Sequence, residues 1–331
     1  MRAFLLATVV LTGCAGAPVR VIGERRASDP TWARAGGSRV RFVGTLSTPE
    51  HLGIERSWWT RVLEFFAGEV EPTALARPVA VAFSDDGRLA VADAGLRGVR
   101  VYEPKRQQHV LVKERLRAPA GVTFAGELLL VADGELRRVF AFDRGGHEVS
   151  PPWAWPTFGR PAGLAWDAAR ARLFVADPAA HCVHVISARG NTTLGHRGDE
   201  DGAFNFPTHV AWAAEQLFVT DALNARVQTF DAQLGFVRAF GGRGDTPGDT
   251  PRPKGLAIDR RGTVWVVEGA FDAVQAFDAQ GQLVALFGGA GTDEGRFWLP
   301  SGAAIDERGL LYVADTWNAR VQVFALEEVG P

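Results

Sequence analysis

The sequence has few cysteines and, after its first residues, no long apolar segment. Cys14 and Cys182 are the only cysteines in 331 residues, which excludes a framework of several disulfides. Beyond residue 13 no apolar stretch is long enough to cross a bilayer as a helix. An excess of one charge is also lacking, because 36 basic side chains are balanced by 38 acidic ones. Such a surface gives no electrostatic support for binding nucleic acid.

Glycine and proline are plentiful, and the prolines mark a repeat. The 38 glycines and 18 prolines are typical of a turn-rich all-β protein. A motif led by proline occurs six times at intervals of 41 to 47 residues, a period that suits a four-stranded propeller blade. The repeats begin at Pro78, Pro119, Pro161, Pro207, Pro253 and Pro300.

Every repeat has the same internal order. The proline is followed by an apolar run, usually a turn signal, and a second apolar run that ends in an acidic residue. Short apolar runs bounded by Gly, Asp and Asn predict strands. Radial packing of six such sheets predicts an all-β, six-bladed β-propeller of four-stranded blades. The acids that end the second runs are Asp93, Asp133, Asp177, Asp221, Glu268 and Asp315.

The sixth repeat lacks a predicted outermost strand, and a segment upstream of all the repeats resembles the missing piece. Residues 39–46 (RVRFVGTL) have the alternation of the fourth strands in other repeats, such as residues 236–241. We expect this segment to pair with the third strand of the sixth blade, at about residues 320–324, and so to close the ring. We also expect its deletion to destabilise the whole domain.

One segment has the signature of a short helix before the first blade. Ser57 is a suitable N-cap, Gly68 is a suitable C-cap, and most residues between them are apolar. We predict a helix over about residues 57–67 that packs across the propeller and covers its channel. The alternative is an exposed helix that binds a membrane surface or a partner, and the exposure of Trp58 and Trp59 distinguishes the two.

The repeats resemble a known family. The segments FPTHVAWAAEQLFVTDALNARVQTFDAQLGFVRAFGGRG and LPSGAAIDERGLLYVADTWNARVQVF are similar to NHL repeats, and the similarity covers about residues 78–326. The chain as a whole resembles the bacterial NHL-repeat lipoproteins. This resemblance implies a six-bladed propeller but no particular activity, because NHL propellers include RNA-binding and protein-binding domains as well as peptide-amidating lyases.

The first residues resemble a lipoprotein signal. Arg2 supplies a positive charge, residues 4–11 form a short apolar run, and residues 11–14 (LTGC) look like a lipobox. We expect residues 1–13 to be a signal peptide and Cys14 to be lipidated, which would hold the protein at a membrane. The alternative is an ordinary secretory signal in which the cysteine is incidental.

Residues 14–38 show no sustained period and are rich in Ala, Gly, Arg and Pro. We interpret them as a lipidated tether that leads to the propeller of residues 39–331. If Cys14 is lipidated, Cys182 has no disulfide partner, and we expect it to be a packing thiol. Residue 15, which follows the lipidated cysteine, is Ala rather than Asp. By resemblance to the sorting rules of Gram-negative lipoproteins, this favours the outer membrane facing the periplasm if the host is Gram-negative.

The sequence does not present a recognisable catalytic set. Five small residues and one histidine lie two positions after the repeat prolines, and they suit a narrow channel rather than a metal site. These residues are Ala80, Gly121, Gly163, His209, Gly255 and Gly302. We interpret the repeated acids as structural, because Arg138, Arg226 and Arg320 each lie five residues after one of them. We therefore predict no catalytic residues, no metal and no cofactor.

Residues that differ between the blades are the better candidates for binding. His209, Lys254, Arg226 and Trp317 replace small residues at or near the expected channel rim, and Trp and Arg are frequent anchors of interfaces. They form our candidate binding face. We expect an envelope lipoprotein whose propeller is a non-catalytic scaffold for a protein or peptide, without nucleic acid. The alternatives are a metal-assisted lyase or hydrolase in the channel and a carbohydrate or cell-wall binder, and the oligomeric state stays open.

Overall fold

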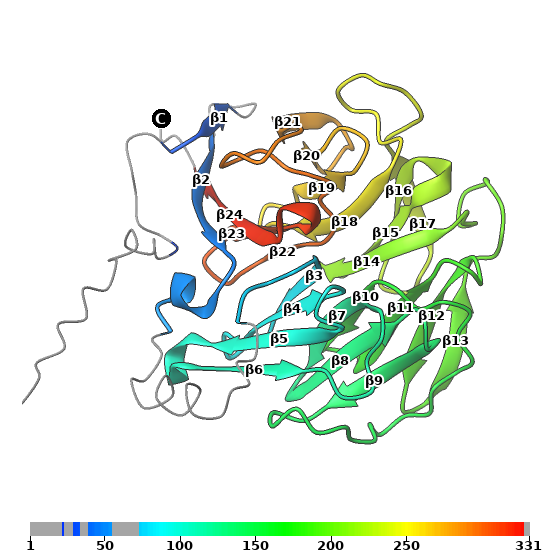
Figure 1. Cartoon of the computed structure of the whole chain (residues 1–331). Coiled ribbons are helices and arrows are strands. Elements are labelled where there is room, and N and C mark those ends of the chain that lie inside the picture. Colours follow the sequence, from blue (N-terminus) through cyan, green and yellow to red (C-terminus); the bar gives the residue numbers. More distant parts are fainter. Residues whose placement is uncertain (1–21, 23–28, 34–38, 55–72, 328–331) are drawn as a thin grey trace, which may run out of the picture.

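The structure is a computed structural model that describes residues 22, 29–33, 39–54 and 73–327. Its strands form six antiparallel sheets arranged as the blades of a propeller (Figure 1). The signal peptide, Cys14, most of the expected tether and the helix predicted at about residues 57–67 lie outside the described residues. Within the described part of the chain no helix is long and apolar enough to span a membrane.

The first three blades follow one another along the chain. The first blade contains β3 (Pro78–Phe83), β4 (Leu89–Asp93), β5 (Gly98–Glu103) and β6 (Gln108–Val112). The second contains β7 (Pro119–Ala125), β8 (Leu128–Asp133) and β9 (Arg138–Phe142). The third contains β10 (Leu164–Asp167), β11 (Arg172–Asp177), β12 (Cys182–Ser187) and β13 (Gly190–Leu194).

The remaining blades continue the ring. The fourth contains β14 (Pro207–Ala213), β15 (Gln216–Asp221), β16 (Arg226–Phe230) and β17 (Phe236–Phe240). The fifth contains β18 (Pro253–Ile258), β19 (Val264–Glu268), β20 (Ala273–Phe277) and β21 (Leu283–Gly288). The sixth is built from both ends of the chain, with β22 (Ala303–Ile305), β23 (Leu310–Asp315), β24 (Arg320–Glu327), β2 (Arg39–Leu46) and β1 (Thr31–Ala33).

The second blade differs from the others at its outer edge. The place of its fourth strand is taken by a single bridge between Phe142 and Glu148, with a further backbone hydrogen bond from Val149 to Ala141. Pro151 and Pro152 follow directly. Because proline has no backbone N–H to donate to a ladder, the strand ends there.

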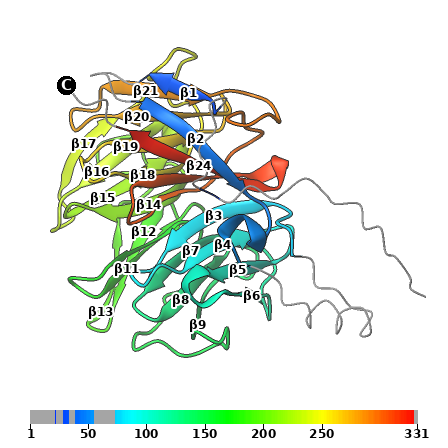
Figure 2. The ribbon, with the colours of Figure 1, turned by 90° about the vertical axis from the view of Figure 1, so that its left-hand side faces the viewer.

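The predicted closing strand is confirmed. β2 pairs antiparallel with β24 from Arg39 opposite Glu327 to Leu46 opposite Val321, so the two ends of the chain share one blade (Figures 1 and 2). The structure also shows a strand inside the segment that we interpreted as a tether. This strand, β1, pairs with β2 and extends the sheet. The ring centroids of Trp32 in β1 and Phe287 are 5.3 Å apart. This aromatic packing explains why residues 31–33 are ordered into a strand.

The apolar core is divided into six clusters, and each joins two neighbouring blades. Phe42, Trp265 and Phe324, for example, are fully buried between the fifth and sixth blades. A single sheet cannot bury both of its faces, so each blade depends on the next one in the ring. Cys182, which we expect to be a packing thiol, is buried.

Four short 3-10 helices complete the described structure. No helix within the described ranges reaches seven residues. Two of them, η4 (Ala222–Asn224) and η5 (Thr316–Asn318), form the turns between the second and third strands of the fourth and sixth blades. The four are η2 (Pro49–Leu52), η3 (Pro104–Arg106), η4 (Ala222–Asn224) and η5 (Thr316–Asn318).

The register brings the repeated prolines and acids to one end of the propeller. Pro78 lies opposite Asp93, and Pro119 lies opposite Asp133. Pro253 in the same way lies opposite Glu268. We call this end the rim: it carries the starts of the inner strands and the turns between second and third strands.

Candidate functional site

The inner strands pack tightly around the channel. A Cβ atom added to Gly255 would lie 2.6 Å from Cα of Gly302, and one added to Gly302 would lie 2.7 Å from Cα of Ala80. Only glycine permits such close approach of neighbouring backbones. His209 stands in this ring beside Gly163, whose backbone N–H donates to the Thr208 carbonyl at 2.9 Å. The ring is therefore crowded, as the sequence predicts.

The repeated acids hold the rim loops. All six are fully buried, and each carboxylate accepts hydrogen bonds from backbone N–H groups. Asp93 is representative: it accepts from Ala76, Arg77, Gly95 and Leu96 at 2.7 to 3.0 Å. A buried carboxylate saturated by such donors stabilises the loops around it. This geometry agrees with the structural interpretation of the acids.

Side chains complete the acid sites in some blades. Asp221 accepts from Asn224, Arg226 and Gln228, and Asp315 has the same set of partners in the sixth blade. The expected acid–arginine pair is thus present in two blades. In the second blade it is absent, because Arg138 lies 3.5 Å from Glu148 instead of pairing with Asp133. There the acid is already satisfied by four backbone donors.

The acids also fix a set of residues that our sequence analysis missed. In every blade the acid accepts the backbone N–H of the residue one or two positions before the repeat proline, at 2.6 to 3.0 Å. We call these six residues the rim ring: Arg77, Arg117, Arg160, Asn205, Arg252 and Trp298. The signal was visible in the sequence as the Arg-Pro pairs that open three of the repeats.

An exposed aromatic pair lies beside the rim ring. Trp298 and Trp317 are 50% and 51% exposed, and their ring centroids are 6.1 Å apart. The Trp317 backbone N–H donates to the Trp298 carbonyl at 3.2 Å, which ties the two loops together. Leu299 donates to Asp272 at 2.7 Å, so the pair adjoins the turn of the fifth blade. Large exposed aromatic side chains of this kind are typical of binding surfaces.

The fifth blade carries a polar cluster with displaced pKa values. Glu268 replaces the usual aspartate, and its extra methylene leaves Oε2 buried without a hydrogen-bond partner. Burial raises the pKa of Glu268 to about 7. Burial also lowers the pKa of Lys254, and the neighbouring Arg252 adds to that effect. His209 is affected likewise, because burial and the charge of Lys254 lower its pKa to about 4.

The structure separates the four predicted site residues. His209 and Lys254 lie close enough for the charge of Lys254 to lower the pKa of His209, and Trp317 lies at the same end of the propeller. Arg226 is occupied with a structural role. It donates to Asp221 at 2.9 Å and to the carbonyls of Glu200 and Ala203, which holds the loop before the fourth blade. Within the described residues no group of three or more His, Cys, Asp or Glu side chains is placed to hold a metal ion.

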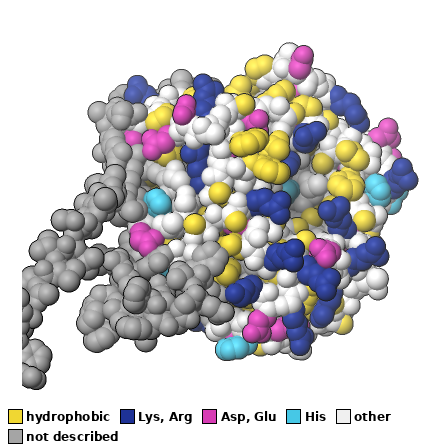
Figure 3. All heavy atoms as spheres, viewed as in Figure 1, with side chains coloured by type: hydrophobic (Ala, Val, Ile, Leu, Met, Phe, Trp, Pro, Cys, Tyr) yellow, Lys and Arg dark blue, Asp and Glu magenta, His cyan; other side chains and the backbone are white. Residues whose placement is uncertain are grey.

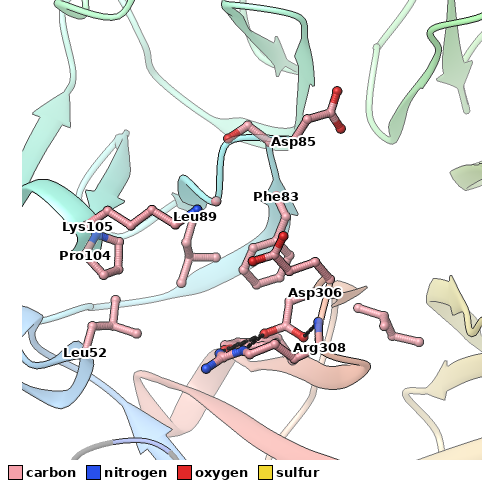
Figure 4. A pocket seen from close by; sticks show the side chains of 13 residues that line it. Leu52, Phe83, Asp85, Leu89, Pro104, Lys105, Asp306 and Arg308 are labelled. Carbon is pink, nitrogen blue, oxygen red and sulfur yellow. Dashed lines mark hydrogen bonds and ion pairs between the residues drawn. The ribbon is translucent and has the colours of Figure 1, made fainter.

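A hollow lies away from the rim, between the first and sixth blades. It has a volume of about 450 Å³ and is lined by Leu52, Phe83, Leu89 and Asp306 among others (Figure 4). The Arg308 side chain donates to Asp306 at 2.9 Å, so its charge is already paired. The rest of the lining comes from the turns that join first and second strands, from Pro104 and Lys105 of η3, and from Tyr312 of β23.

The six blades define the chain as a β-propeller, and residues 297–324 match the model of the NHL repeat. The chain is thus a six-bladed propeller with an NHL repeat in its sixth blade. No curated protein matches its sequence.

Solved structures share the fold at low sequence identity. An auxiliary nutrient binding protein from Bacteroides thetaiotaomicron is 12% identical, with a TM-score of 0.63 over 78% of this chain and 71% of that one. A gluconolactonase from Xanthomonas campestris is 15% identical, with a TM-score of 0.62 over 95% and 99%. A chain of a nidogen/laminin complex is also 15% identical, with a TM-score of 0.55 over 78% and 92%. Likeness at this level establishes the fold and leaves the activity open.

Proposed function

We propose that this protein is a non-catalytic scaffold that binds a protein or peptide partner in the cell envelope, with the rim as its binding face. The observation that carries the proposal is the Trp298–Trp317 pair, half exposed at the rim. Aromatic side chains contribute a large contact area at low entropic cost, and they are enriched among the residues that dominate binding energies. Leu223, 54% exposed on η4, adds an apolar group at the same end.

The construction of the rim supports this function. Its loops are held by buried carboxylates and backbone hydrogen bonds, so its exposed side chains project from a rigid frame. Rigid presentation lowers the entropy lost on binding. The structural neighbours include an auxiliary nutrient binding protein and a chain of a nidogen/laminin complex, which is consistent with a binding role for this fold.

We place the protein in the envelope through Cys14. Lipidation there would anchor the propeller, and the outer membrane facing the periplasm is our choice for a Gram-negative host. A Cys14→Ser variant is expected to lose incorporation of a labelled fatty acid and to leave the membrane fraction, while a Cys182→Ser variant keeps both. Equal labelling of the two variants would contradict lipidation at Cys14.

One observation favours an enzyme as the second candidate. Glu268, Lys254 and His209 lie together beside the channel with displaced pKa values, a property common at catalytic sites. The gluconolactonase neighbour shows that this fold can support hydrolysis in another protein. Turnover of a lactone or ester that is lost in Glu268→Gln but retained in Trp298→Ala would favour this candidate over a scaffold.

The scaffold is tested by recovering the protein from its native membranes after mild crosslinking. We expect the wild-type chain to carry a stoichiometric partner, and the Trp298→Ala/Trp317→Ala variant to lose it. Val237→Ala/Leu286→Ala is the matched control, because both residues are exposed and apolar but lie on the outer strands β17 and β21. Equal recovery of the partner with both double variants would contradict binding at the rim.

A further inference from the structure

Four of the six positions of the rim ring are arginines. Arg77, Arg117, Arg160 and Arg252 are all exposed, and each backbone is fixed by the acid of its own blade. Nothing in the acid sites requires arginine, because the bond uses the backbone N–H, and Asn205 and Trp298 fill the same place in two blades. The guanidinium groups are therefore free to serve another purpose.

The charges of these arginines are largely unpaired. Among the described residues Arg77, Arg160 and Arg252 form no ion pair, while Arg117 lies 3.5 Å from the exposed Glu135. An exposed pair of this kind contributes little, so it competes weakly with a ligand. The carboxylates beneath the ring are buried and already accept several hydrogen bonds each.

Further cations lie at the same end of the propeller. Arg97 and Arg137 occupy the turns between second and third strands in the first two blades, and both are exposed without an ion pair in the described structure. Lys254 lies beside Arg252 of the rim ring, and both side chains lie against Gly269. In Figure 3 Lys and Arg side chains gather at the lower right of the face seen, where Figure 1 places the second and third blades.

We propose that the rim ring recognises the carboxylates of an acidic peptide segment, while Trp298 and Trp317 pack on its apolar side chains. The inference rests on the proposed scaffold function and names the chemistry of the partner. Arginine suits this task because its planar guanidinium forms paired hydrogen bonds with a carboxylate. An acidic peptide fits better than a nucleic acid, because the whole chain carries a formal charge of −2 and combines its basic ring with an apolar aromatic pair.

The test is the affinity of the purified propeller for labelled synthetic peptides. The probe is a short peptide of glutamate and leucine, and its counterpart carries glutamine in place of glutamate. We expect the glutamate peptide to bind at least about tenfold more tightly at low salt, and added salt to remove most of this difference. Equal affinity for the two peptides would overturn the inference.

Variants locate the effect. Arg77→Gln/Arg160→Gln/Arg252→Gln is expected to weaken binding of the glutamate peptide at least about tenfold, since it removes three ring charges. The matched control is Arg106→Gln/Arg189→Gln/Arg261→Gln. It removes the same charge from turns at the opposite end of the propeller. Equal losses in the two variants would mean that net charge alone drives binding, and the ring would lose its role.

Two further outcomes separate the inference from the function on which it rests. If a single-stranded oligonucleotide binds as tightly as the glutamate peptide and also depends on the ring, the partner is a nucleic acid and the inference fails. If the peptides do not bind but the crosslinked partner is still lost from the Trp298→Ala/Trp317→Ala variant, the scaffold stands and the acidic chemistry is wrong. If the peptides do not bind and the Trp298→Ala/Trp317→Ala variant still recovers the partner, both the acidic chemistry and binding at the rim are wrong.

Discussion

At the scale of single residues, one buried acid in each blade holds the rim loops by hydrogen bonds, but the side chains that donate to this acid differ between blades. Seven residues after the acid, the fourth and sixth blades have Gln228 and Gln322, which donate to it at 3.1 and 3.0 Å. The third blade has His184 at this place, 3.2 Å from Asp177. A glutamine has no charge to lose, whereas a histidine titrates, so the third blade should have a pH dependence that the fourth and sixth blades lack at this position.

The stability of the protein is expected to fall between about pH 6.5 and pH 9 because of His184. Burial alone would lower the pKa of His184, but its hydrogen bond to Asp177 and the neighbouring Cys182 outweigh burial and raise the pKa to about 9. A raised pKa means that the charged form stabilises the folded state below pH 6.5, and that this contribution is lost as the pH passes the folded value.

The matched variant is His184→Gln, which supplies the partner found in the fourth and sixth blades. Urea unfolding near pH 6 and near pH 9 should show a drop in stability for the wild-type chain of at least about 1 kcal/mol relative to the variant. Parallel pH profiles of the two proteins would contradict the pairing of His184 with Asp177.

At the scale of elements, the closing strand is the decisive one, because it joins the two ends of the chain. Val40, Phe42 and Leu46 of β2 are fully buried, and Phe42 lies 5.9 Å from the Phe324 ring of β24. The strand therefore contributes to the clusters on both sides of the sixth blade. An open ring would expose these faces to water and leave β24 as an unpaired edge.

Phe42→Ala is expected to cost about 3–5 kcal/mol of unfolding free energy, because it leaves a cavity in a packed cluster. Phe236→Ala is the control. That phenylalanine is 37% exposed on the outer strand β17, so we expect a clearly smaller cost. The two variants are compared by urea denaturation at one pH. Similar costs for the two would mean that β2 does not lock the ring.

At the scale of the whole molecule, the blades meet at the channel through the small residues of the inner strands, among them Gly255 and Gly302. A Cβ at Gly255 would clash with the backbone of Gly302 in the next blade, so Gly255→Ala must push two inner strands apart. We expect a loss of about 1–3 kcal/mol and a single cooperative unfolding transition at lower temperature. Gly242→Ala is the control, because the nearest atom there lies 3.7 Å away, and thermal unfolding measures both. Equal melting temperatures would contradict close packing at the axis.

The repeat made most of this architecture predictable. One proline, one acid and their spacing define a blade, and the alternation of residues 39–46 identified the closing strand. β1 escaped prediction because three residues carry no period, and its strand depends on where Trp32 packs. The outer edge of the second blade also differed, because Pro151 and Pro152 follow the place where a fourth strand would begin.

The site was harder to predict than the fold. His209 and Lys254 were placed near the channel from their position in the repeat, and the charge of Lys254 reaches His209 and lowers its pKa. Arg226 was chosen for its residue type and its expected place near the channel rim, and in the structure its donors bind Asp221 and the loop before the fourth blade. The rim ring depends on hydrogen bonds between residues 16 or 17 positions apart, and no local pattern reports which N–H groups a buried acid reaches.

Photo-crosslinking in cells tests the central claim most directly, because it asks which end of the propeller touches the partner. A photoreactive aromatic amino acid, which keeps an aromatic ring at the site, replaces Trp317 at the rim in one strain and Arg189, exposed in the turn between β12 and β13 at the opposite end, in another. We predict a discrete crosslinked partner from position 317 and none from position 189. A partner captured from position 189 alone, or no product from either position, would contradict binding at the rim.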